Sequence, residues 1–159
     1  MNIKTLFTSS ILTLAAGTAS AGVPDADVWA ALQVQSSVLS IHPKCDQPFI
    51  AQQEKQLGGT LARQDFITAA AQGKVMSANV AACAIQAKNS LSQWADQAGR
   101  MLAIGVIAAT RVPGGMTTPE VASSGDRATL LLQYAAEHGS PTATEMLGML
   151  QQSNYRTFN

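Results

Sequence analysis

The sequence predicts an all-α domain: a compact helical bundle or an irregular array of six to eight helices, crosslinked by one disulfide. Three observations lead to this prediction. Apolar residues recur with helical spacing along most of the chain, alanine is very frequent, and no segment alternates β-branched and aromatic residues as a half-buried strand would. A chain of 159 residues is long enough for one domain with a substantial core.

The first 21 residues have the pattern of a secretory signal peptide. Lys4 precedes an uncharged apolar stretch at 6–16, and Ala19-Ser20-Ala21 matches the small-residue motif at which signal peptidase cleaves. The apolar stretch is about half as long as a membrane-spanning helix, so we expect no stable membrane anchor. The predicted organisation is a leader at 1–21, a single helical domain at 22–152 and a polar tail at 153–159, in a periplasmic or secreted protein.

The amino-terminal half of the domain carries signals for four helices. Pro24-Asp25 suits a first helical turn, and the helix must end before Pro43 because a residue that precedes proline avoids helical angles. Glycines are the expected ends of the next two helices, and Ser77 is the expected N-cap of the fourth. These signals give helices from 24 to about 41, 48–57, 60 or 64 to 73, and 77–88, with breaks at Gly58-Gly59 and at Gly73.

A fifth helix is expected at about 90–110. It carries no charge between Met101 and Ala109, which is typical of a central buried helix. Ala95, Gly99 and Ala103 lie four residues apart on it, and such small side chains would let another helix approach closely.

The remaining chain is expected to form a loop and then a helical hairpin. Residues 111–126 are rich in glycine, proline and serine, so we expect a loop with at most a single helical turn near Thr118. The last two helices, at 126–138 and 141–152, are separated only by Gly139-Ser140, which predicts an antiparallel pair.

The hairpin also carries a pattern of small and apolar residues. Ala128, Leu132, Ala135-Ala136, Gly139, Ala143 and Leu147-Gly148 read as A-x3-L-x2-AA-x2-G-x3-A-x3-LG. Over residues 127–152 this pattern resembles the helical hairpin of Sel1-like repeats, which are relatives of the tetratricopeptide repeat. The resemblance implies a helical repeat that binds other proteins. The chain has no convincing second copy upstream, whereas a solenoid needs about three repeats.

Cys45 and Cys83 are the two cysteines of the chain. In an oxidising compartment thiols tend to pair, and two cysteines allow a single internal disulfide. The chain-entropy model assigns roughly 4 kcal/mol to a closed loop of this length. We expect this disulfide, with buried free thiols or pairing between chains as the alternatives.

Charge and motifs exclude several classes of function. Without the leader the chain has nine cationic and ten anionic side chains and no basic patch, so we expect no nucleic-acid partner. No metal-ligand spacing or phosphate-binding loop is present, so we expect no cofactor and no metal site. His42 near Cys45 would form a nucleophile only with a free thiol. His138 is expected to stabilise the negative end of a helix.

These exclusions favour a non-enzymatic protein that binds another protein, as an adaptor, an immunity-type inhibitor or a secretion accessory. Tyr134, Met146 and Met149 are the candidate partner-binding face, since methionine adapts to varied surfaces, although a methionine stripe of this kind is more often ordinary core.

Two further functions stay open. A small periplasmic hydrolase would need acids such as Asp65, Asp96 and Glu120 to converge on one pocket. A carrier of an apolar ligand would need a sizeable apolar cavity beside the uncharged stretch 101–109.

Overall fold

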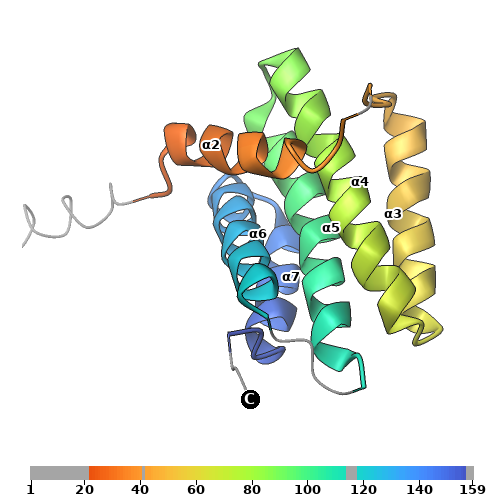
Figure 1. Ribbon diagram of the computed structural model, residues 1–159. Coiled ribbons are helices and arrows are strands. Elements are labelled where there is room, and N and C mark those ends of the chain that lie inside the picture. The colour runs from red at the N-terminus through yellow and green to blue at the C-terminus, as the bar shows by residue number, and fades with distance from the viewer. Residues whose placement is uncertain (1–21, 41, 114–117, 157–159) are drawn as a thin grey trace, which may run out of the picture.

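The computed structural model describes residues 22–40, 42–113 and 118–156, and the expected leader lies outside these ranges. Within them the chain forms six α-helices and no strand, which confirms the predicted all-α class. None of these helices combines the length and the apolar character needed to cross a membrane. The helices are α2 (Asp25–Ser36), α3 (Gln47–Ala62), α4 (Phe66–Ala87), α5 (Leu91–Arg111), α6 (Pro119–Glu137) and α7 (Pro141–Gln152) (Figure 1).

Helices α4 and α5 form the centre of the molecule. Figure 1 shows α3, α4 and α5 side by side, with α6 beyond α5 and α2 running across one end of this row. Helix α2 packs on α4, α5 and α6, and α7 packs on α5 and α6. Every residue from Met101 to Ala109 is buried, as the uncharged stretch predicts for a central helix.

Glycines set how closely α5 approaches its neighbours. A Cβ atom on Gly73 of α4 would lie 2.6 Å from the Cα of Gly105 and 2.8 Å from the carbonyl oxygen of Met101. Because both are backbone atoms of α5, this crossing has no room for a side chain. On the α6 side, a Cβ on Gly99 would lie 3.0 Å from the side chain of Leu132. Gly99 thus permits the close helix approach expected from its spacing.

Two predicted glycine breaks are wrong. Helix α3 continues through Gly58-Gly59, and α4 runs without interruption from Phe66 to Ala87. Gly73 serves the crossing with α5 and ends no helix. Ser77, the expected N-cap of a separate helix, is buried in the middle of α4.

Two other boundaries also differ from the prediction. Helix α2 ends at Ser36, where the hydroxyl groups of Ser36 and Ser37 donate to carbonyl oxygens of the preceding turn. Residues 119–126, expected within a loop, form the first turns of α6. The hydroxyl of Thr118 accepts the N–H of Val121 at 3.2 Å, and the next residue is a proline, which suits a helix start.

The hairpin between α6 and α7 matches the prediction. Gly139 has a φ of 92°, a value that favours glycine, and it lies just beyond the end of α6. The Ser140 hydroxyl then accepts the N–H of Ala143 at 3.2 Å and caps α7. The buried Ala128, Leu132, Ala135 and Ala143 belong to one apolar cluster of this part of the molecule.

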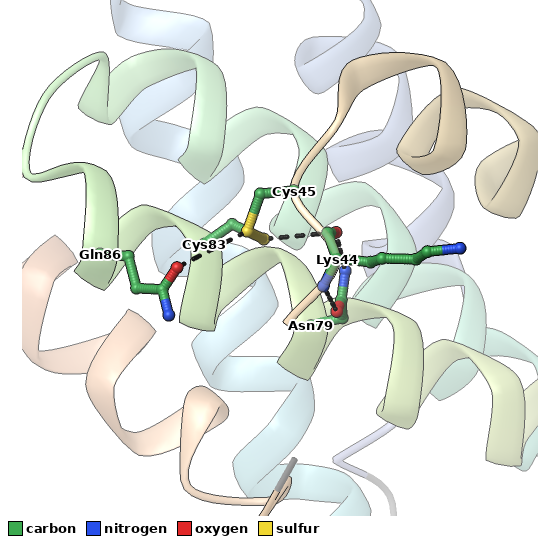
Figure 2. The surroundings of a disulfide bond; sticks show 5 residues. All are labelled: Lys44, Cys45, Asn79, Cys83 and Gln86. Atoms are coloured by element: carbon green, nitrogen blue, oxygen red, sulfur yellow. Dashed lines mark hydrogen bonds between the residues drawn. A yellow bond between two sulfur atoms is a disulfide. The ribbon is translucent and has the colours of Figure 1, made fainter. Parts of the chain in front are cut away.

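The predicted disulfide joins Cys45 to Cys83 and attaches the α2–α3 connection to α4, with the Cα atoms 5.5 Å apart. Figure 2 shows Asn79, one helical turn before Cys83, beside the backbone of Lys44. Its side-chain amide donates to the Lys44 carbonyl oxygen at 2.8 Å and accepts the Lys44 N–H at 2.9 Å. One covalent bond and two hydrogen bonds therefore hold the start of α3 against α4.

Candidate binding groove

An apolar groove of about 290 Å³ lies between α4, α5 and the first turns of α6, and it is half-open to solvent. Four of its lining residues come from α5, whose stretch 101–109 is buried throughout. Three helices contribute the lining: Ala70, Ala71 and Lys74 from α4; Leu102, Gly105, Val106 and Ala109 from α5; Thr118, Glu120, Val121 and Ser124 from α6 and its cap.

The small size of the side chains along α4 and α6 explains why the groove stays open. Ala70 and Ala71 on one wall and Ser124 on the other cannot reach across to each other, and Gly105 has no side chain. Leu102 and Val106 are buried within the fold, but because the groove is open, a small part of their surface lines it. Apolar surface at the base of a half-open groove is typical of binding sites.

A salt bridge connects the two walls at the mouth of the groove. Lys74 of α4 donates to the carboxylate of Glu120 on α6, and their side chains are 48% and 69% exposed. The hydrogen bond from Lys74 lowers the pKa of Glu120, and the positive charge of Lys74 acts in the same direction. A pair this exposed adds little stability, so an approaching partner can separate it at low cost.

A polar network joins α2, α4 and α6 at one end of the groove. Arg127 of α6 donates from Nε to Gln35 Oε1 at 3.1 Å, and its terminal nitrogens lie 3.5 Å from the hydroxyls of Ser123 and Ser124. Gln35 is 1% exposed. Its amide nitrogen donates to Ser77 Oγ at 2.9 Å and to the Lys74 carbonyl oxygen at 3.3 Å.

Arg127 has no direct carboxylate partner in this network. Among the described residues, the salt bridges within 4.0 Å involve other cations: Lys74, Arg100 and Arg156. Burial lowers the pKa of the Arg127 guanidinium, and the charge of Glu120 offsets this only in part. A half-buried and incompletely neutralised positive charge therefore lies beside the groove, next to its lining residue Ser124.

The three residues expected to bind a partner differ in exposure. Tyr134 is 4% exposed and stacks on His138, with the ring centroids 4.0 Å apart. Met146 is half-buried and packs against both apolar clusters. Met149 is 41% exposed. Of the three, only Met149 offers a partner an exposed side chain.

The carboxylates considered for acid–base chemistry have separate structural roles. Asp65 caps α4 by accepting the N–H of Thr68 at 3.3 Å. Asp96 accepts from Arg100 Nε at 3.0 Å, and burial raises its pKa. Glu120 alone of the three lines the groove.

His138 and the two cysteines also have structural roles. Cys45 is oxidised, so it is not a nucleophile beside His42. His138 follows the last residue of α6, and its Nδ1 lies 2.7 Å from the Tyr134 carbonyl oxygen, which fits its expected role at a helix end. No three His, Cys, Asp or Glu side chains in the described ranges gather as potential metal ligands.

No protein-family model, curated protein sequence or solved structure matches the chain. The groove is therefore the feature that indicates a function. Sequence reasoning did not single out Ala71, Lys74 or Arg127, because these residue types carry no motif. The sequence signals at this place were the uncharged stretch 101–109, which includes four lining residues, and the candidate acid Glu120.

Proposed function

We propose that the protein is a non-enzymatic, exported protein that binds an apolar segment of another protein in this groove. The observation that carries the proposal is the half-open apolar groove of about 290 Å³ with charged side chains at its mouth. Protein interfaces commonly place an apolar anchor in a pocket and surround it with polar groups that exclude water. The groove offers both features.

The shape of the groove favours a protein segment over a carried small molecule. Sites for small ligands commonly enclose about 70–90% of the ligand surface. Here the groove above Leu102 and Val106 is half-open, so a ligand would keep much of its apolar surface in water. The apolar side chain of a protein segment would not stay exposed to water in this arrangement. The backbone and the neighbouring residues of that segment would cover the open side of the groove.

Export is part of the same proposal. The leader predicted at 1–21 would direct the chain out of the cytosol, and the disulfide between Cys45 and Cys83 supports this route, because such bonds persist in oxidising compartments. The Sel1-like resemblance of residues 127–152 agrees with a role in protein binding and stays a prediction.

The test is capture of a partner from periplasmic extract by the mature wild-type protein and by two variants. In Ala71→Leu, a larger side chain enters the groove. Ala51→Leu makes the same change at an exposed position of α3, away from the groove. We expect wild type and Ala51→Leu to retain one partner in stoichiometric amount and Ala71→Leu to lose it. A partner retained equally by all three proteins would place the binding site elsewhere.

A further inference from the structure

Helix α2 shows how the surface between α4 and α6 accepts a helix. It packs on α4, α5 and α6 and buries Val28, Leu32 and Gln35 there. In Figure 1 it crosses the upper part of these helices and does not extend over their lower part. Gln35, in the last turn of α2, donates to the backbone of Lys74, which lines the groove. The groove therefore begins where α2 ends.

The contact between Gln35 and Arg127 indicates which polar group fits beside the apolar anchor. The Gln35 side chain offers one amide oxygen to Arg127 Nε at 3.1 Å. The two terminal nitrogens of the guanidinium have only serine hydroxyls, at 3.5 Å, the outer limit of a hydrogen bond. One of these serines, Ser124, lines the groove. A half-buried guanidinium whose terminal nitrogens have only weak partners, one of which lines the groove, is suited to a stronger acceptor.

The charges around the groove favour an anionic acceptor. Lys74 and Arg127 supply two positive charges, while Glu120 supplies one negative charge, which pairs with Lys74 and acts on Arg127 only from beyond salt-bridge distance. An acidic group from a partner would balance this excess, and a basic group would increase it. Carboxylates also match the planar guanidinium with two parallel hydrogen bonds, which an amide or a hydroxyl does not offer.

We infer that the groove recognises a protein segment in which a large apolar side chain is accompanied by an Asp or Glu, whose carboxylate pairs with Arg127 at the α2 end of the groove. This inference rests on the proposed binding of a protein segment. The apolar side chain occupies the space above Leu102 and Val106. The carboxylate accepts hydrogen bonds from the guanidinium of Arg127, to which Gln35 offers only one oxygen.

Selection from a library of random displayed peptides tests this inference and does not require the partner to be identified first. The immobilised protein is the mature wild type, with Ala71→Leu used in parallel to remove peptides that bind outside the groove. We expect the groove-dependent peptides to be enriched in a large apolar residue close to Asp or Glu. Changing that Glu to Gln in a synthetic copy should weaken binding to wild type about tenfold.

The other outcomes of the selection distinguish a failure of the acidic preference from a failure of the groove proposal. Groove-dependent peptides that are neutral or basic, or a Glu-to-Gln change without effect, would overturn the acidic preference and leave groove binding intact. A selection without any groove-dependent peptide would overturn the groove proposal together with the acidic preference.

Two cation variants then locate the carboxylate. Arg127→Gln should remove most of the difference between the Glu and Gln peptides. Lys55→Gln, which removes a cation from α3, away from the groove, should preserve the difference. An equal difference in affinity between the Glu and Gln peptides in both variants would show that Arg127 does not bind the carboxylate. The comparison of Glu and Gln peptides on wild type stays valid even if Arg127→Gln fails to fold.

Discussion

Helix α5 meets its surroundings in two opposite ways around Gly105. Toward Gly73 the backbones of α5 and α4 are in contact, and a single added carbon atom would overlap α5. Toward Ala70 and Ala71, on the same stretch of α4, the side chains leave a groove of about 290 Å³. Both regions are built from small residues, yet one is closed and the other is open.

The difference depends on what lies opposite each small residue. At the crossing, Gly73 and Gly105 of two helices face each other, so the backbones come together. At the groove, Ala71 faces Ser124 and Glu120 of a third helix that does not reach it. Small residues thus permit close packing at the crossing and leave open space at the groove. Enlarging a side chain should therefore affect stability differently at the two places.

Removal of the disulfide should have the largest effect on stability while leaving the groove intact. Replacing Cys45 and Cys83 by alanine should lower the free energy of unfolding by up to about 4 kcal/mol, because the unfolded chain regains the freedom of a long loop. Binding in the groove should persist, since neither cysteine nor α3 lines it. Urea unfolding and peptide affinity measure the two effects. Unchanged unfolding would mean that the contacts of Asn79 suffice to hold the connection.

Filling the crossing should have the next largest effect. In Gly73→Ala the new methyl group meets backbone atoms of α5 at 2.6–2.8 Å, so the helices must separate. We expect a loss of about 3 kcal/mol in the free energy of unfolding, measured in urea. Gly58→Ala is the matched control, because a Cβ there meets nothing within 4 Å. It should stabilise the protein by about 0.5–1 kcal/mol. Equal losses in both variants would contradict the close crossing.

Filling the groove should have the smallest effect on stability. Ala71→Leu adds more atoms than Gly73→Ala, two residues away on the same helix, but the new side chain enters open space. The free energy of unfolding should change by no more than about 0.5 kcal/mol. A loss as large as that of Gly73→Ala, in the same urea experiment, would mean that no open groove exists at this position.

The sequence was informative about individual helices and the disulfide, and less informative about how the helices pack against one another. The uncharged stretch 101–109, the Gly139-Ser140 break and the pair of cysteines predicted a buried helix, a hairpin and a disulfide, as the structure confirms. Gly73 was misread as a helix end, because its role depends on the distance to a helix that begins 18 residues later. No periodic pattern distinguishes a glycine that ends a helix from one that permits a crossing.

The groove could not be predicted from the sequence, for a related reason. Its walls come from alanine and serine on helices that are distant in sequence, and such residues carry no chemical signature. Residues 119–126 were expected to form a loop, which removed one whole wall from the predicted arrangement. Tyr134, Met146 and Met149 were chosen for their chemistry, whereas their exposure depends on packing that sequence does not reveal.

Methyl NMR of the mature protein during titration with the selected acidic peptide tests the central claim most directly. If the groove is the binding site, the methyl signals of Leu102, Val106 and Val121 should shift most, and those of Ile50 and Leu57 in α3 should stay unchanged. Shifts concentrated at Met146 and Met149, with the groove methyls unaffected, would contradict the account and move the partner to the surface of α7.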